Sequence, residues 1–393
     1  MNYKNIKKQD IEVYKIIKGE EKRQKENIEL IASENYVSEA VREALASDFT
    51  NKYAEGRPGK RFYGGQEWTD KIEILAQERA KKLFKCKYAN VQPLSGAPAN
   101  LAVYTALLKP GDKVLGMDLG AGGHLTHGHP ATHAAKIYKF ISYGLNPKTE
   151  KIDYKEVEKL ALKHKPKIIL AGFSAYPRNI DWKKFRKIAD KVGAILMVDV
   201  AHIAGLIAGK AIENPFDYGF DIVSTTTHKT LRGPRGGMIM VRDDLEIFKK
   251  INSAVFPGLQ GGPHMNNISA LAVALGEALR PEFRKYAKQV IKNTKAMEEV
   301  FKKHKIKMIS GGSDNHLILI DVWKSFGIGG KEAQEKLEEA GITTNKNMIF
   351  QDSRTAGDPS GIRLGTAAMT SKGYKTNDFK KVAKKIIDTL RSQ

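Results

Sequence analysis

The segment KIILAGFSAYPRNIDWKKFRKIADKVGAILMVDV (residues 167–200) is the clearest indication of the fold. Two short runs that are apolar throughout, 167–173 and 194–200, lie on either side of an amphipathic stretch at 181–193. Such runs, joined by a helix, are typical of parallel strands in a sheet that is covered on both faces. The segment therefore predicts a β-α-β unit of an α/β protein.

The same alternation extends from about residue 71 to residue 241. Further apolar runs lie at 113–117, 221–225 and 236–241, and another amphipathic stretch covers 153–165. We expect a mostly parallel sheet, with ligands beyond the carboxyl ends of its strands.

Beyond Arg280-Pro281 the pattern changes to a long charged helix, an apolar run at 316–322 and a helix at 331–341. The first fifty residues look helical and irregular, as in an arm that packs on another part of the protein. We therefore expect an N-terminal arm (1–50), a large ligand-binding domain (51–280) and a small C-terminal α+β domain (281–393).

Composition limits the class of protein. The 393 residues are 41% hydrophobic, as in a globular chain that can bury a large core. The first residues are polar, no apolar segment is long enough to span a bilayer, and Cys86 is the single cysteine. These features predict a cytoplasmic protein without an internal disulfide framework or a membrane-spanning segment.

The net charge of +22 raises the question of nucleic-acid binding. However, the basic residues are spread along the chain and often lie beside acids, as in KEVEKLALKHK (155–165). This pattern favours a solvated, lysine-rich surface, so no specific nucleic-acid partner is expected.

Lys229 is the first candidate for chemistry. In DIVSTTTHKTLRGPRGG (221–237) it follows a buried type of strand and precedes a glycine-rich exit. Burial at such a place lowers the pKa of an amine and makes it a nucleophile toward a carbonyl. An ordinary surface lysine is the alternative.

Asp199 ends the apolar run at 194–200, where a carboxylate is costly unless a cation pairs with it. A pyridinium nitrogen is such a cation, and a structural Asp that caps the next helix is the alternative. Ser95, Gly96 and Ala97 form a turn that opens an amphipathic helix, where free N–H groups can hold a phosphate or Ser95 can serve as an N-cap. Together these three features supply what pyridoxal phosphate needs.

Several segments now carry a resemblance to a known family. From about residue 20 onward the chain resembles serine hydroxymethyltransferases, whose signature segments occur here in the family's order. They are LIASENY (30–36), NKYAEGRPGKRFYGG (51–65), GGHLTHG (122–128), FSAYP (173–177), VDVAHIAGL (198–206), TTTHKTLRGPRGG (225–237), FPGLQGGP (256–263) and SGIRLGT (360–366).

The resemblance implies the α/β fold of fold type I pyridoxal-phosphate transferases, with a large, mostly parallel sheet of seven strands and a smaller C-terminal α+β domain. It implies reversible transfer of the serine hydroxymethyl group to tetrahydrofolate, giving glycine and methylene-tetrahydrofolate by way of an external aldimine. Pyridoxal 5'-phosphate would be the cofactor and tetrahydrofolate the co-substrate. The protein would be a homodimer whose active sites are shared between subunits.

The resemblance also implies roles for individual residues. Lys229 would bind the cofactor as an imine, with Glu55 as the acid/base group and Thr226, His228 and Tyr63 as further catalytic residues. Cofactor contacts would come from Ser95, Gly96 and Ala97 at the phosphate, Asp199 at the ring nitrogen, His124 on the ring face, Ser174 and His202 near the ring hydroxyl, and Tyr53, Gly261 and Gly262 across the subunit boundary.

On the substrate side, Arg363 would take the serine carboxylate, since its planar fork suits two parallel hydrogen bonds. Ser33 would lie beside it. Tyr63 and Glu55 would come from the other subunit, and the folate site would be lined by Leu119, Gly123, Leu125 and Asn347.

Two departures from the family pattern stand out. Ala97 replaces a frequent serine, so that position offers the phosphate only its N–H, and Phe350 stands where a proline is expected in the pterin pocket. The histidines at 124, 127, 129 and 133 could suggest a metal, but their loose spacing, with no nearby cysteine, does not favour one.

Two other functions compete with this interpretation. An aldolase acting on threonine or phenylserine would use the same scaffold, and serine turnover that depends on tetrahydrofolate separates it from the transferase. A basic nucleic-acid-binding protein with a vestigial site is the other, although the candidate catalytic positions are intact.

Overall fold

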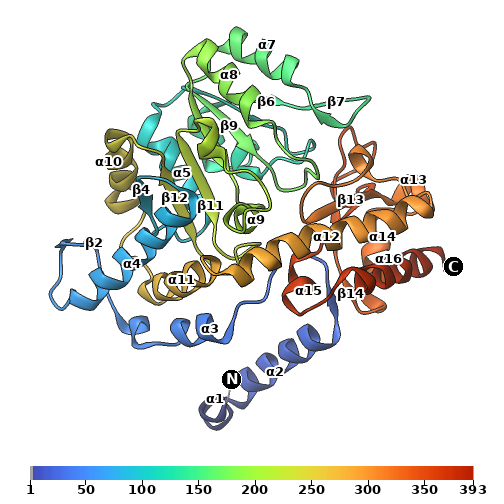
Figure 1. Ribbon diagram of the computed structural model, residues 1–393, viewed down its shortest axis with the longest axis horizontal. Coiled ribbons are helices and arrows are strands. Elements are labelled where there is room, and N and C mark those ends of the chain that lie inside the picture. The colour runs from blue at the N-terminus through green and yellow to red at the C-terminus, as the bar shows by residue number, and fades with distance from the viewer. Residues whose placement is uncertain (1–2, 393) are drawn as a thin grey trace.

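The computed structural model describes residues 3–392 and is built around a seven-stranded sheet (Figure 1). Strand β12 is antiparallel to both of its neighbours, whereas the other paired neighbours run parallel. The predicted mostly parallel sheet of an α/β fold is thus confirmed. In spatial order the strands are β4 (Tyr88–Asn90), β12 (Gly237–Val241), β11 (Ile222–Thr226), β10 (Ile195–Asp199), β9 (Ile168–Gly172), β5 (Lys113–Met117) and β6 (Lys139–Tyr143).

The central strands are buried along almost their whole length and mostly apolar because both faces of the sheet are covered. In β9, Ile168 and Leu170 belong to one apolar core, while Ile169 and Ala171 belong to the other. The covering helices are α4 (Glu67–Phe84), α5 (Gly96–Leu107), α6 (His133–Ile137), α7 (Tyr154–His164), α8 (Trp182–Val192), α9 (Ala204–Ala208), α10 (Leu245–Ser253) and α11 (Met265–Ala278). Two short hairpins lie outside this sheet, β2 (Gly56–Arg57) with β3 (Lys60–Arg61) and β7 (Leu145–Asn146) with β8 (Lys151–Ile152).

Helix α12 (Pro281–Lys303) leads from the sheet region into the C-terminal region (Figure 1). There, β13 (Leu317–Asp321), β16 (Gly361–Gly365) and β15 (Asn345–Asn347) form an antiparallel sheet with an apolar core of its own. The helices of this region are α13 (Val322–Phe326), α14 (Gly330–Glu339), α15 (Ala367–Ser371) and α16 (Thr376–Arg391).

The N-terminal helices α1 (Lys4–Gln9) and α2 (Ile11–Glu26) project from the rest of the chain and contain no buried residue (Figure 1). After them, β1 (Ile28–Glu29) pairs with β14 (Ile342–Thr343) of the C-terminal region, and α3 (Glu39–Leu45) packs on α11. Among residues 3–392, no helix has both the length and the apolar character needed to cross a membrane.

Candidate active site

Three candidate residues follow neighbouring strands at the carboxyl edge of the sheet. Asp199 is the last residue of β10, Ser174 follows β9, and Lys229 follows β11. Parallel strands end at the same edge, so these side chains meet around a cavity of about 350 Å³. The cavity is lined by Ser33, Glu34, Ser95, Gly96, Ala97, His124, Phe173, Ser174, Asp199, Ala201, Thr226, His228, Lys229 and Arg235.

Asp199 is buried and surrounded by hydrogen-bond donors. Asn100 Nδ2 donates to Asp199 Oδ2 at 2.8 Å, and the Ala201 N–H donates to Oδ1 at 2.9 Å. His127 Nε2 lies 3.3 Å from Oδ2. Burial raises the pKa of this carboxyl, but the interactions with His127, His124 and Asn100 outweigh burial and keep the pKa below its usual value. Asp199 is therefore a buried carboxylate that stays ionised.

The ring of His127 is fixed by two hydrogen bonds. Its Nδ1 accepts from the backbone N–H of His124 at 3.2 Å, so the proton of the neutral ring is on Nε2 and points at Asp199. His127 and Asp199 could hold a metal together with His124, but the ring nitrogens of His127 are already used in these hydrogen bonds.

His124 precedes the short helical turn η2 (Leu125–His127) and lines the cavity. Its Nδ1 accepts from the backbone N–H of Thr126 at 3.2 Å. Burial lowers the pKa of His124 to about 4, and the charges of Lys229 and Arg363 act in the same direction. The ring is thus uncharged at neutral pH.

Lys229 is almost fully buried, with 8% of the residue exposed. Burial, with smaller contributions from the charges of Arg363 and Arg235, lowers the pKa of its amine to about 8 against the opposing effect of Asp199. A much larger fraction of this amine is neutral at pH 7 to 8 than of a solvated lysine, and the neutral amine is the nucleophile.

Two buried polar atoms beside Lys229 have no hydrogen-bond partner within residues 3–392: Thr226 Oγ1 and His228 Nδ1. An unpaired buried polar group costs about 1–3 kcal/mol. Both residues line the cavity, so a polar ligand there would satisfy them. Burial lowers the pKa of His228 to about 4, with Arg235 and Lys229 acting in the same direction, so this ring also is neutral at pH 7.

The first turn of α5 opens on the same cavity. Within the described chain, the Ser95 side chain makes no capping hydrogen bond to α5, so its hydroxyl and the first N–H groups of the helix remain available. A Cβ at Gly96 would lie 2.7 Å from Thr226 Cγ2, so a larger residue would push against Thr226. Arg235 adds positive charge to this end of the cavity. An anion cradle, an ionised carboxylate and a nucleophilic amine in one cavity fit pyridoxal phosphate.

A second cavity of about 400 Å³ adjoins the first and shares Ser33, His124, Ser174 and Lys229 with it. Its other lining residues include six candidates: Leu119, Gly123, Leu125, His202, Asn347 and Arg363.

Arg363 is held from two sides of the second cavity. Its Nη1 donates to the Ser174 carbonyl at 2.8 Å, and its Nε donates to Asn345 Oδ1 at 3.2 Å. Burial lowers the pKa of Arg363 to about 10, which leaves it charged at neutral pH. The fixed guanidinium can therefore bind an anion such as a carboxylate in this cavity.

The remaining candidates form a separate cluster on the surface of the chain. Tyr53 Oη donates to Glu55 Oε1 at 3.0 Å, and Tyr63 Oη lies 3.4 Å from Glu55 Oε2. A Cβ at Gly261 would lie 3.3 Å from Glu55 Oε1, and one at Gly262 would lie 3.4 Å from the Tyr53 ring. None of these five residues is among those that line the two cavities of the described chain.

Sequence reasoning missed three residues that support the site. Asn100 links Asp199, Thr126 and Ser224, whose Oγ donates to Asn100 Oδ1 at 2.6 Å. His316 Nε2 lies 3.2 Å from His202 Nδ1, and the two imidazole rings stack on each other. The third is His127, which the sequence suggested only as one of four possible metal ligands and not as a partner of Asp199. Asn100 lies one helical turn after the Ser95 turn, which is the one sequence signal that could have found it.

Phe350, which replaces the expected proline, packs against the large apolar core of the sheet region. Its Cε2 would lie 3.3 Å from a Cβ built on Gly144, just beyond the end of β6. Phe350 thus packs the segment after β15 against the sheet region, close in sequence to Asn347 and Met348, which line the second cavity.

Comparisons with known proteins agree with this geometry. The family model described as serine hydroxymethyltransferase matches residues 6–386. A serine hydroxymethyltransferase of Lactobacillus johnsonii is 59% identical over 375 residues, which cover 95% of this chain and 90% of the relative. One from Lactobacillus gasseri is 56% identical over the same length, with the same coverage of both chains.

Proposed function

The chain belongs to the serine hydroxymethyltransferase family, and we propose roles for its own residues in the reaction of that family. The enzyme is a one-carbon transferase that interconverts serine and glycine, with pyridoxal phosphate as cofactor and tetrahydrofolate as co-substrate. The observation that carries the residue assignment is the buried, ionised Asp199 at one strand end and the buried Lys229 at the next, in one cavity.

The cofactor supplies a protonated ring that draws electrons away from the substrate α-carbon. In our proposal, Asp199 keeps the ring nitrogen protonated, and its low pKa supports that role. The turn at Ser95, Gly96 and Ala97 holds the phosphate. Lys229 binds the cofactor covalently, which its lowered pKa favours.

Further cofactor contacts complete the proposal. The uncharged His124 would stack on the ring, Ser174 and His202 would lie at the ring hydroxyl, and Thr226 Oγ1 and His228 Nδ1 would gain the partners they lack within residues 3–392.

Arg363 binds the amino-acid carboxylate in our proposal, with Ser33 beside it. Two contacts already fix its guanidinium, so little freedom is lost when the carboxylate binds. Leu119, Gly123, Leu125 and Asn347 line the same cavity and would contact the pterin.

We further propose a homodimer in which each subunit completes the site of the other. Tyr53 and Tyr63 are 56% and 49% exposed, and Phe62 and Trp68 beside them are 72% and 65% exposed. Such a group of exposed aromatic side chains favours burial against a second copy of the chain. Glu55 would then reach the partner's cavity and move a proton to and from the serine hydroxyl.

Two expectations from the sequence, the location and the domain division, are kept as proposals. The enzyme acts in the cytoplasm. It has an N-terminal arm (1–50), a large domain (51–280) and a small domain (281–393). The separate apolar core of the C-terminal region supports the last boundary.

The shared site is tested by mixing two inactive variants, Lys229→Ala and Glu55→Gln, under conditions where subunits exchange. In a mixed dimer, one site carries both changes and the other carries neither. Random pairing makes about half of the dimers mixed, so about a quarter of wild-type activity should return.

Lys229→Ala mixed with Asp199→Ala is the control, and it should recover nothing because both residues lie on the same side of the shared site. Native mass spectrometry shows whether mixed dimers form. Mixed dimers of the first pair that remain inactive would refute the shared site.

A further inference from the structure

Residues 173–179, the larger part of the loop that joins β9 to α8, connect the active site to the C-terminal region. Its first residues carry Ser174, whose carbonyl accepts the hydrogen bond from Arg363, and its last residues carry Arg178. We propose that Arg178 is a positioning residue for the amino-acid carboxylate: it fixes the loop whose Ser174 carbonyl orients Arg363. The inference rests on the proposed role of Arg363.

The beginning of the loop is anchored in the sheet region. The N–H groups of Ser174 and Ala175 both donate to the carbonyl of Gly122, at 2.8 and 3.0 Å. Gly122 has a φ of +105°, and a Cβ there would lie 2.9 Å from the Ala175 backbone, so this approach requires glycine.

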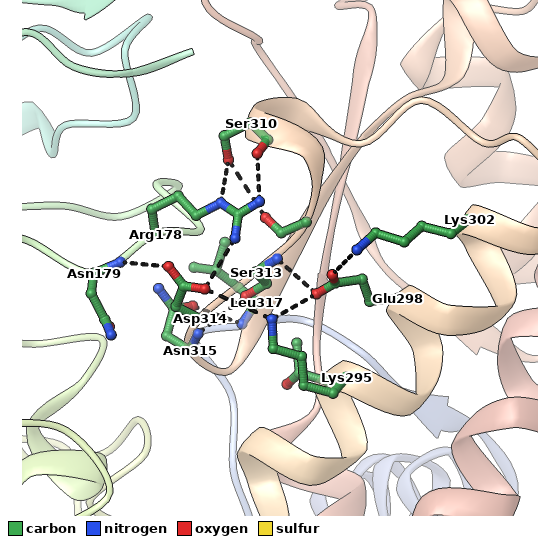
Figure 2. Close-up of polar contacts among 12 residues, drawn as sticks. Arg178, Asn179, Lys295, Glu298, Lys302, Ser310, Ser313, Asp314, Asn315 and Leu317 are labelled. Atoms are coloured by element: carbon green, nitrogen blue, oxygen red, sulfur yellow. Dashed lines mark hydrogen bonds and ion pairs between the residues drawn. The ribbon is translucent and has the colours of Figure 1, made fainter. Parts of the chain in front are cut away.

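The end of the loop is anchored in the C-terminal region by the Arg178 guanidinium, as Figure 2 shows. Nη1 donates to Asp314 Oδ1 at 3.0 Å, Nε donates to Ser310 Oγ at 3.1 Å, and Nη2 donates to the Ser310 carbonyl. The Asp314 N–H donates back to the carbonyl of Pro177 at 2.8 Å. The planar guanidinium thus bonds both Ser310 and Asp314.

Asp314 is itself held in place by α12. Lys295 Nζ lies 3.7 Å from Asp314 Oδ1 and 3.1 Å from Glu298 Oε2, and the Glu298 carboxylate accepts from the Ser313 N–H at 3.0 Å (Figure 2). The Arg178–Asp314 pair is only partly exposed, at 16% and 35% of the side chains, so solvent screens it less than an exposed pair.

The segment that Arg178 bonds leads directly into β13, which pairs with β16, the strand that carries Arg363. Residues 310–316 run into β13, where Leu319 pairs with Arg363 of β16. Asn315 Nδ2 also donates to the Tyr176 carbonyl at 3.2 Å. Arg178 therefore links the two structures whose separation sets the Ser174–Arg363 hydrogen bond: the loop that carries the acceptor and the sheet that carries the donor.

Loss of Arg178 should weaken substrate binding without disturbing the cofactor. Ser174 would keep its contact with Gly122, but the sheet of the C-terminal region could shift relative to the loop, and Arg363 with it. We expect a rise of about tenfold in the glycine Kd, because a displaced Arg363 would keep only part of its charge-assisted contact with the carboxylate.

The experiment compares Arg178→Ala with Arg186→Ala in cofactor-saturated enzyme. Arg186 is a matched control because it is similarly buried, at 23% against 16% side-chain exposure, and also bonds a carbonyl and a carboxylate, those of Gly219 and Asp221. Calorimetric titration with glycine should show the tenfold rise for Arg178→Ala and a change below about twofold for Arg186→Ala. The cofactor Kd of both variants should match that of the wild type.

A double variant tests whether Arg178 acts through Arg363. Arg178→Ala should add little to the glycine Kd when Arg363 is already Lys, because the hydrogen bond to Ser174 is then already altered. Arg178→Lys serves if Arg178→Ala does not fold, since one ammonium cannot grip Ser310 and Asp314 in the same way.

Each outcome bears on one of the two assignments. Wild-type glycine binding by Arg363→Lys would refute the role of Arg363 itself. Weak binding by Arg363→Lys with normal binding by the folded Arg178 variant would overturn the role of Arg178 alone. Equal effects of the Arg178 and Arg186 substitutions, or full additivity in the double variant, would also overturn it.

Discussion

Lys229 should destabilise the folded enzyme when the cofactor is removed, so its replacement by methionine should stabilise the apoenzyme at pH 7. Burial lowers the pKa of this amine from 10.5 to about 8. A difference of about 2.5 pKa units corresponds to about 3 kcal/mol. Methionine carries no charge and has a similar length, so we expect Lys229→Met to raise the free energy of unfolding by up to that amount.

The pH dependence distinguishes this charge effect from better packing. Between pH 8 and pH 10.5 the unfolded wild type keeps a proton on Lys229 that the folded protein has lost. The free energy of unfolding rises with pH where the unfolded state binds more protons than the folded state. Over this range, the free energy of unfolding of the wild type therefore rises relative to that of Lys229→Met. The advantage of Lys229→Met should be full below pH 8 and should disappear near pH 10.5.

Urea denaturation of the two apoenzymes at several pH values measures this difference. Lys187→Met, at an exposed position of α8, is the control and should change stability by less than about 0.5 kcal/mol at every pH. An apoenzyme that is equally stable with Lys or Met at pH 7, or an advantage that does not change with pH, would refute the reasoning.

Two further substitutions test the support of the cofactor site. Asn100→Ala removes hydrogen bonds to Asp199 and Ser224 and should lower the free energy of unfolding by about 2–4 kcal/mol. Ser224→Ala should lower the free energy of unfolding clearly less. Equal losses for the two variants in urea denaturation would contradict this expectation. Gly96→Ala, at the start of α5, should raise the cofactor Kd by about tenfold or more, because the added Cβ would press on Thr226. Unchanged cofactor binding in a fluorescence titration would show that the phosphate site tolerates a methyl group.

The sequence predicts those parts of the fold that depend on local pattern. The apolar runs that become β5, β9, β10 and β11 are strands within one or two residues of the predicted bounds, because burial on both faces requires continuous apolar residues. The direction of β12 was not predictable in this way. Its apolar run looks like those of its neighbours, and only the short connection from β11 to the antiparallel β12 reverses the chain.

The candidate site likewise contains residues that the local sequence pattern predicts and residues that it does not. Asp199 and Lys229 could be found from the sequence because a charged residue at the end of an apolar run is costly to bury unless it has a partner or a chemical role. Their supports were missed because each lies far away in sequence: His127 is 72 residues from Asp199, and His316 is 114 residues from His202. Such pairs are created by strand order and packing, which local spacing does not encode.

The charges of the two cavities favour anionic ligands. Burial lowers the pKa of Lys229 to about 8 and of Arg363 to about 10, and each cation lowers the pKa of nearby histidines such as His124 and His202. Asp199 and Glu34 are the carboxylates that line the two cavities, and they are outnumbered by the cations Lys229, Arg235, Lys346 and Arg363. A phosphate at α5 and a carboxylate at Arg363 would each bring negative charge close to these cations. Burial of the cations lowers the stability of the folded chain, and their attraction to a bound anion offsets that cost and contributes to the binding free energy.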